Sequence, residues 1–199
     1  MRYPKLYEKM APLGPIPEQE WVRAEALGRE QGVERKGLFL RPGEKVDRFG
    51  LVLQGVFRLV RVSARGAEMV KAFRSEGDLV GAYAEMLMRV PSMTTIEALE
   101  PSRLLVFREQ DIQALEAGHV CWVRVLRRVA ERHFLMKERR EQEFLEFSAE
   151  ERLDMFWSEH AHLKGRVPQR DVAAYLGITE VALSRIMSRR RKRAESEED

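Results

Sequence analysis

The sequence predicts an α+β protein with a β-rich N-terminal half, one long helix and a C-terminal helix-turn-helix. Three observations support this fold class. Short β-prone runs lie between regularly spaced glycines, a proline-free stretch carries a seven-residue repeat, and two short amphipathic helices flank a glycine near the C-terminus. The chain has 199 residues, of which 44% are hydrophobic, so it is long enough to bury a real core.

The first predicted element is a short helix that follows a loop. Four prolines between residues 4 and 17 indicate an irregular entry. From residue 18 to residue 29 the pattern becomes periodic, with Trp21, Ala24 and Leu27 on one side. This spacing predicts a helix with one buried face.

The β-rich segment is predicted from about residue 33 to residue 107. Glycines at positions 43, 55, 66 and 77 are 12, 11 and 11 residues apart, and strand-forming runs such as LVLQG, VFRLVRV, EMVKAF and RLLVF accompany them. In VFRLVRV, apolar residues partly alternate with Arg58 and Arg61, as in a strand with one face in water. Regular short strands separated by turns predict a β-sandwich, roll or jelly roll.

A long helix is predicted after the strands. Residues 109–147 contain no proline, and their single glycine, Gly118, is expected to divide a short helix from a long one. In the long helix five side chains recur at steps of four and three, the spacing of a coiled-coil seam. We predict that this seam pairs with a second copy in a homodimer; the alternative is that it packs only on the chain's own β-region. The seam residues are Trp122, Leu126, Val129, His133 and Met136.

The next segment, SAEERLDMF, predicts a further amphipathic helix. Ser148 and Glu151 have the spacing of a capping box, which marks the start of a helix. A boundary between domains is therefore expected near residues 144–148. We predict a sensor-like β-domain in residues 1–108, a dimerisation helix region in 109–147, and a helix-turn-helix domain with a basic end and an acidic tail in 148–199.

The segment PQRDVAAYLGITEVALSRIMSRR predicts the helix-turn-helix itself. Val172 and Leu176 lie on one face of the first helix, and Leu183 and Ile186 of the second helix point back at them. Gly177 stands where the sharp turn between the helices requires a positive φ. Together these residues have the order and spacing of a DNA-binding helix-turn-helix; the alternative is a plain helical hairpin with a solvated basic end.

The charge distribution indicates a polyanionic partner. Residues 1–160 carry equal numbers of basic and acidic side chains, whereas residues 161–193 carry nine Lys or Arg against two Asp or Glu. Clustered cations release counterions from double-stranded DNA, which favours binding. We expect the second helix to read base edges through Glu180, Val181, Ser184 and Arg185. Predicted phosphate contacts are Gln169, Arg170, Thr179, Ser188, Arg189, Arg190 and Arg191.

The chain resembles the Crp/Fnr family of bacterial transcription regulators over almost its entire length. The glycine-punctuated β-segment carries the resemblance, together with SEGDLVGA before a short helix, ALEPSRLLVF, SAEERL and, most specifically, VPQRDVAAYLGITEVALSRI. It implies a cyclic-nucleotide-binding-like β-roll, a long dimerisation helix and a winged helix-turn-helix domain. It also implies a homodimer that binds a palindromic operator. If the protein is an activator, this dimer would also contact RNA polymerase.

The resemblance also places an effector pocket near Gly81, Ala82, Arg89, Ser92 and Thr94. Cyclic-AMP-binding members carry a Gly-Glu pair there and, further along, an Arg-Ser or Arg-Thr pair. This sequence has Gly-Ala at 81 and 82 and Ser-Met at 92 and 93, so the carboxylate for the ribose and the arginine for the phosphate are missing. Arg89 is close in sequence, but it would have to reach the phosphate of the nucleotide from a different position in the pocket. We therefore expect that cyclic AMP is not the effector, which is unknown or absent.

No cofactor and no metal are predicted. The single cysteine, Cys121, cannot hold the iron–sulfur cluster of oxygen-sensing relatives, and we expect it to be a small core residue. The histidines at 119, 133, 160 and 162 show no convincing ligand set, and His133 on the seam is expected to be a hydrogen-bonded packing residue. The chain ends soon after the second helix, where many relatives form a wing, and its acidic ESEED end is expected to be disordered.

Two other classes of function remain as alternatives. The sequence has no nucleophile elbow, phosphate-binding glycine loop, HExxH or CxxC, so an enzyme is not expected. A regulator that acts through protein partners, without reading bases, is the second alternative. Because neither an export signal nor a membrane span is apparent, a cytoplasmic protein is expected.

Overall fold

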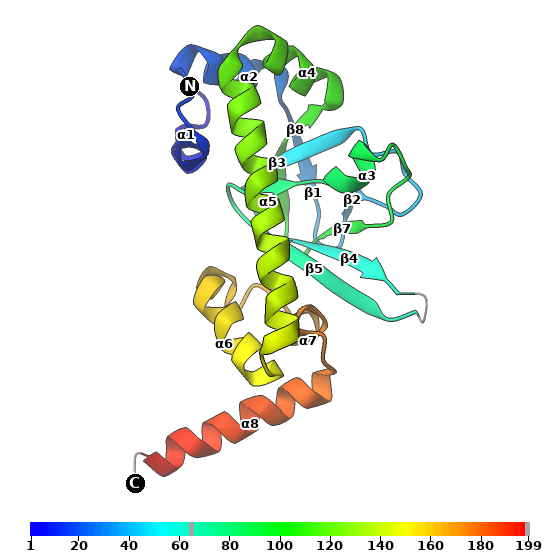
Figure 1. Ribbon diagram of the computed structural model, residues 1–199, viewed down its shortest axis with the longest axis vertical. Coiled ribbons are helices and arrows are strands. Elements are labelled where there is room, and N and C mark those ends of the chain that lie inside the picture. Colours follow the sequence, from blue (N-terminus) through cyan, green and yellow to red (C-terminus); the bar gives the residue numbers. More distant parts are fainter. Residues whose placement is uncertain (64–65, 198–199) are drawn as a thin grey trace.

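The computed structural model describes the backbone of residues 1–63 and 66–197, and the side chains of these residues as far as 191. Figure 1 shows an elongated molecule with a β-roll in its upper part and a bundle of short helices below it. One long helix, α5, passes along the β-roll and reaches the lower helices, and α8 forms the lower end. None of the helices in the described residues is both long and apolar enough to cross a membrane.

The N-terminal segment is more helical than its prolines predict. Pro4–Met10 forms α1, Ala11–Leu13 forms the 3₁₀ turn η1, and Glu18–Leu27 forms α2. The prediction of an irregular entry is therefore wrong for α1. Pro4 occupies the first helical position, where the backbone N–H that proline lacks would have no partner within the helix. The predicted helix at residues 18–29 exists but ends at Leu27, and Arg29 begins the first strand.

The predicted β-roll is confirmed as two antiparallel sheets of four strands. The strand orders are β1-β8-β3-β6 and β2-β7-β4-β5, and the short helix α3 (Tyr83–Leu87) follows β6. The strands are β1 (Arg29–Val33), β2 (Leu38–Leu40), β3 (Arg48–Gln54), β4 (Phe57–Val62), β5 (Glu68–Arg74), β6 (Leu79–Val80), β7 (Thr95–Ala98) and β8 (Ser102–Arg108).

Strand β8 is buried on both faces, which explains its unbroken apolar run. Leu104 and Val106 point into the core between the two sheets. Leu105 and Phe107 point the other way and pack against α2, α4 and α5. Because successive side chains of a strand alternate between faces, a strand covered on both sides needs apolar residues at every position.

The helices after the strands begin and end close to the predicted places. Gly118 ends α4 (Glu109–Gly118), and α5 (Val120–Glu146) follows it. The capping box is present, since the Ser148 hydroxyl accepts from the Glu151 N–H and the Glu151 carboxylate accepts from the Ser148 N–H. The remaining elements are α6 (Ala149–Glu159), the 3₁₀ turn η2 (Ala161–Leu163), α7 (Gln169–Leu176) and α8 (Glu180–Glu197).

The C-terminal end differs from expectation. Helix α8 continues to Glu197, so residues 195–197 of the acidic end have helical backbone and are not disordered as predicted. Residues 198 and 199 lie outside the described part of the chain. Helical propensity explains the extension, because the segment contains Arg, Lys, Ala and Glu without Gly or Pro.

The heptad seam of α5 faces the chain's own β-roll. Trp122 is buried in a core with Leu51 and Leu105, and the other four seam residues line a cavity beside the outer face of the sheet that contains β3 and β8. The seam therefore contacts the chain's own β-roll, as the alternative expects, but Met136 at its end is 42% exposed, and pairing of the seam with a second copy stays a prediction. The heptad spacing identified the apolar face of α5 but not its partner, because the same spacing suits either surface.

Candidate nucleic-acid interface

Helices α7 and α8 form the predicted helix-turn-helix. Gly177 has φ +70°, the left-handed conformation that ends α7, and the Thr179 hydroxyl accepts from the Ala182 N–H at 3.2 Å at the start of α8. The side chains expected between the two helices are buried, namely Val172, Ala173, Leu176, Leu183 and Ile186. The interior of the motif is therefore as the sequence predicts.

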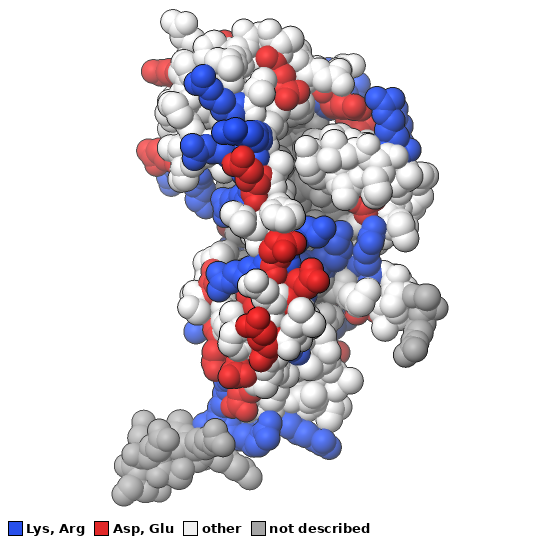
Figure 2. All heavy atoms as spheres, in the orientation of Figure 1, with Lys and Arg blue, Asp and Glu red and all other residues white. Residues whose placement is uncertain are grey.

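The opposite side of α8 is open to solvent. Val181 is 61% exposed, and Ser184 and Arg185 lie beside it on the same face. One turn further on, Ser188 and Arg189 continue that face, and Glu180 is exposed at its beginning. In Figure 2, blue Lys and Arg side chains gather along α8 at the lower end of the molecule, below a region rich in red acidic side chains.

The residues predicted to hold phosphates divide into two groups. Gln169 and Arg170 at the start of α7, and Thr179 before α8, are exposed. Arg190 is different, since its guanidinium donates to Asp154 of α6 at 2.5 and 2.8 Å and to Glu150 at 3.2 Å. These partners raise the pKa of Arg190, with the hydrogen bond to Asp154 contributing most. Arg190 thus holds α8 on α6, and a phosphate contact of Arg190, which stays a prediction, would require it to leave these carboxylates. Arg191 is exposed.

The helix-turn-helix is attached to the β-roll by a shared apolar core. Val60, Val70 and Phe73 of β4 and β5 pack with Phe156 of α6 and Leu176 of α7. Phe73 and Phe156 meet edge to face, with 5.8 Å between ring centroids. The predicted boundary near residues 144–148 separates helices in the chain, but the apolar cores on its two sides merge.

Arg58 of β4 connects the two parts through a buried ion pair. Its guanidinium donates to Asp171 of α7 at 2.6 Å and to Glu97 of β7 at 2.7 Å. Burial disfavours the charges of this cluster; it raises the pKa of Asp171 despite the nearby arginine, whereas the carboxylates around Arg58 raise the pKa of the guanidinium. The sequence predicted Arg58 on a wet face of its strand, and that prediction is wrong because α7 covers the face.

A second ion cluster lies between the turn after β5 and the loop before α7. Arg166 donates to Glu76 at 2.7 and 3.1 Å and to Glu100 at 2.5 Å. Burial alone would raise the pKa of Glu76, but hydrogen bonds from Arg166 and from the Gly55 N–H lower it to about 2. In the same turn, Ser75 and His162 of η2 are hydrogen-bonded at 3.0 Å. The sequence contained no local signal for these contacts.

Arg140 of α5 joins the long helix to both α7 and β5. Its guanidinium lies 3.7 Å from the centroid of the Tyr175 ring and donates to the Tyr175 carbonyl at 2.5 Å and to the Val70 carbonyl at 3.3 Å. One side chain therefore touches the β-roll, the long helix and the helix-turn-helix.

The residues predicted around the effector pocket are partly brought together. Ala82, Ser92 and Thr94 are buried near α3, whereas Arg89, just after α3, is exposed. Gly81 packs so closely on the Phe49 ring that an added Cβ would lie 2.2 Å from a ring carbon.

A carboxylate of the chain itself occupies the middle of this region. The buried Glu85 accepts from Thr94 Oγ1 and from Arg61, each at 2.9 Å. Burial opposes its charge, yet the hydrogen bonds from the Glu85 N–H, Thr94 and Arg61 produce a net lowering of its pKa. Neither Glu85 nor Arg61 was among the residues predicted around the effector pocket.

The expected core role of Cys121 agrees with its burial, which raises the pKa of the thiol. His133 lines the cavity beside α5, where burial lowers its pKa to about 4, and within the described part of the chain it makes no hydrogen bond, contrary to expectation. Among the described residues there is no group of three or more His, Cys, Asp or Glu side chains placed to bind a metal.

Comparison with known proteins agrees with this architecture. Residues 31–119 match the family model for the cyclic nucleotide-binding domain. None of the curated proteins matches the sequence. Many solved structures match the fold, and FixK2 from Bradyrhizobium japonicum superposes with a TM-score of 0.74 at 18% identity, covering 84% of this chain and 86% of that one.

Two further structures extend the likeness. The catabolite activator protein of Thermus thermophilus matches with a TM-score of 0.59 at 20% identity, covering 92% of this chain and 88% of its own. A protein described as a transcriptional regulator of the Crp/Fnr family from Eubacterium rectale matches with a TM-score of 0.69 at 16% identity, covering 89% and 86%. The predicted resemblance and fold are thereby confirmed.

Proposed function

We propose that this chain, which has the fold of the Crp/Fnr transcription regulators, is a DNA-binding regulator of transcription. One observation carries the proposal: the side of α8 that faces away from the protein core presents side chains suited to base edges, beside a cluster of arginines. A helix exposed in this way on a helix-turn-helix fits the major groove. The docked helix-turn-helix leaves that surface uncovered.

The base-reading residues we propose are Glu180, Val181, Ser184 and Arg185. Arg185 is suited to a bidentate contact with guanine, and Val181 to the methyl group of thymine. Phosphates position the helix without reading sequence. The residues proposed to contact them are Gln169, Arg170, Thr179, Ser188, Arg189 and Arg191.

Selection of bound DNA from a random pool by the purified protein tests this function. We expect an enriched, palindromic site, since a two-fold symmetric dimer would read two half-sites. Arg185→Ala should weaken binding to that site by roughly 1–3 kcal/mol and relax the preference at one base pair. The matched control, Arg170→Ala, should weaken selected and random duplexes alike and reduce the salt dependence. Equal affinity of the parent protein for selected and random DNA would contradict base reading.

We also propose a homodimer, but through a different face of α5 from the one first predicted. On the side of α5 away from the β-roll, exposed Val120, Val123 and Phe134 follow the heptad steps, with Arg127 and Ala130 between them. Such a stripe is unusual on a monomer, and a second copy of the same helix would cover it.

Sedimentation of a charged variant tests the dimer face. Phe134→Glu should convert the protein to a monomer at micromolar concentration, because it places a carboxylate in the apolar stripe. Met69→Glu, at an exposed position on β5, is the control and should leave the dimer intact. A monomeric parent protein would refute the homodimer, and a dimeric Phe134→Glu variant would refute this face.

Cyclic AMP is not the effector in this proposal. The region near α3 holds the Glu85 carboxylate, already satisfied by Arg61 and Thr94, and Arg89 points to solvent. A nucleotide phosphate would have to displace Glu85 from Arg61 before it gained a cation. Titration calorimetry with cyclic AMP should show no binding at micromolar concentration, and a measured micromolar affinity would overturn this statement.

A regulator that acts through protein partners without reading bases is the second candidate. It would bind selected and random DNA equally, and Arg185→Ala would leave its activity unchanged. Contact with RNA polymerase and a cytoplasmic location belong to the first proposal, as does the absence of enzymatic activity.

A further inference from the structure

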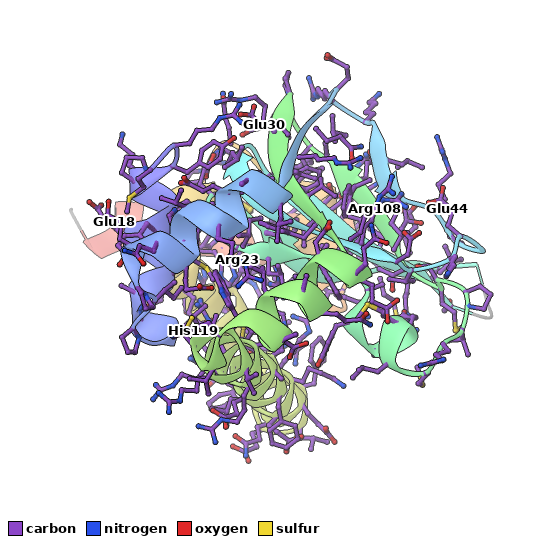
Figure 3. The ribbon with its side chains drawn as sticks, turned by 90° about the horizontal axis from the view of Figure 1, so that it is seen from above. Glu18, Arg23, Glu30, Glu44, Arg108 and His119 are labelled. Atoms are coloured by element: carbon purple, nitrogen blue, oxygen red, sulfur yellow. The ribbon has the colours of Figure 1, made fainter. Side chains whose placement is uncertain are left out.

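A cavity of about 90 Å³ lies between α5, the N-terminal helices and the outer face of the sheet that contains β3 and β8. Its walls are mainly apolar, with Leu13, Trp21, Leu51, Phe107, Trp122 and Val129 among the lining residues. Figure 3, seen from above, shows α2 and α4 crossing over this end of the molecule, with Arg23 between them. Arg23 donates to the Ala114 carbonyl at 2.8 Å and so ties α2 to α4.

The cavity is separate from the predicted effector pocket. Neither Glu85 nor Thr94 lines it. Its residues come from β3, β6, β8, the helices outside that sheet, and the end of β5 with the turn that follows it. Ala82 and Val80, by contrast, belong to the core between the two sheets. A ligand in this cavity would therefore not compete for the groups around α3.

One end of the cavity is cationic. Arg74 and Arg132 line it there beside the neutral His133, with Asp78 as the acidic residue among the lining side chains. Within the described residues, Arg74 forms no ion pair, and its guanidinium donates only to the Phe73 carbonyl, at 3.0 Å. The Asp78 carboxylate is itself occupied by the Ser75 N–H at 2.9 Å. Burial lowers the pKa of Arg74, so a carboxylate beside it would relieve a desolvated charge.

We propose that this cavity binds a small aliphatic carboxylic acid, with its carboxylate on Arg74 and its chain along the apolar walls. Charge complementarity favours an anion, because two arginines face one carboxylate that is already hydrogen-bonded. The volume favours a narrow chain, since the cavity is smaller than the roughly 150 Å³ that accommodates benzene. His133 is neutral near pH 7 and adds a polar but uncharged wall.

The same turn that lines the cavity also holds the helix-turn-helix. Arg74 and Asp78 contribute to the cavity, while Ser75 is hydrogen-bonded to His162 and Glu76 binds Arg166. Five consecutive residues therefore connect the cavity with the C-terminal helices. A carboxylate that draws Arg74 inward would move this turn and alter the docking of α7. This consequence for DNA rests on the proposed function, whereas binding of the acid does not.

Titration calorimetry of the full chain with sodium propionate, an acid with fewer heavy atoms than benzene, tests the site. We expect saturable binding of one propionate per protomer, about ten- to a hundredfold weaker in Arg74→Gln, because a charged hydrogen bond is lost. The neutral 1-propanol should bind the parent protein about as weakly as propionate binds the variant. Arg128→Gln, at an exposed position of α5, is the matched control and should bind propionate like the parent.

A second variant fills the cavity instead of removing its charge. Val129→Phe should abolish propionate binding and keep the parent circular dichroism, which makes the test independent of the folding of Arg74→Gln. No binding of propionate by the parent protein, or parent-like binding by either Arg74→Gln or Val129→Phe, would overturn the proposal. If propionate binds as expected but no DNA is selected, the site stands and the proposed regulatory function fails.

Discussion

At the scale of single residues, arginines decide how the parts of this molecule are joined. Arg58 of the β-roll pairs with Asp171 of α7, Arg166 before α7 pairs with Glu76 of the β-roll, and Arg140 of α5 contacts both parts. Their guanidinium groups present several donors in a fixed plane, which allows one side chain to satisfy two partners at once. Local sequence patterns place such residues on the surface, since a charged side chain in a strand normally faces water.

The buried pair of Arg58 and Asp171 leads to a stability prediction. Arg58→Met would leave Glu97 without its cation and would leave Asp171, which is 2% exposed, with only the more distant Arg170 at 3.6 Å. We expect a loss of about 3–5 kcal/mol in the free energy of unfolding, measured by urea denaturation. The control Arg103→Met breaks an exposed pair with Glu30 and should cost less than about 1 kcal/mol. Similar values for the two variants would contradict the structural role of Arg58.

The cluster of Arg166 and Glu76 predicts a dependence of stability on pH. The pKa of Glu76 is lowered from 4.5 to about 2, so its contribution is fully present above pH 4.5 and is lost as the pH falls through 2. Glu76→Gln should therefore be less stable than the parent protein at neutral pH, and the difference should shrink below pH 4.5. Urea midpoints over this range measure it, and a difference that is independent of pH would exclude the assignment.

At the scale of elements, the turn between α7 and α8 combines two constraints at one glycine. Gly177 has φ +70°, and a Cβ added there would lie 2.7 Å from the Phe144 ring of α5. Gly165 has φ +77° but open space around it. The two glycines therefore separate the cost of backbone conformation from the cost of a steric clash.

Replacement of each glycine by alanine measures these costs. Gly165→Ala should lose roughly 1–2 kcal/mol of stability, the cost of the left-handed conformation alone. Gly177→Ala should lose more, because Phe144 and the end of α5 must also move. Thermal and urea unfolding of the two variants provides the comparison. If both lose the same amount, α5 does not restrain this turn.

At the scale of the whole molecule, the β-roll and the helix-turn-helix share one core. Val70 and Phe73 of β5 pack with Leu176, and the ion pairs of Arg58 and Arg166 cross the same boundary. Apolar contacts of this kind make the two parts cooperate in unfolding. Any movement of the DNA-reading helix relative to the β-roll must therefore disrupt buried contacts.

Single-tryptophan variants test this cooperativity. Trp157 lies in α6, whereas Trp21 and Trp122 belong to the core beside the β-roll. A protein with only Trp157 and a protein with only Trp21 should unfold at the same midpoint, and far-ultraviolet circular dichroism should follow the same curve. An earlier transition reported by Trp157 alone would mean that the C-terminal helices detach before the β-roll unfolds.

Features that depend on neighbours along the chain could be predicted from the amino-acid sequence alone. The turn at Gly177, the capping box at Ser148, the break at Gly118 and the strand-rich segment follow from backbone preferences and from periods of two or 3.6 residues, which local sequence encodes directly. The tertiary structure decided which surfaces meet. It turned the heptad face of α5 onto the β-roll, covered Arg58 with α7 and left Arg74 beside a cavity, because apolar or charged faces specify a need for partners without specifying the partners themselves.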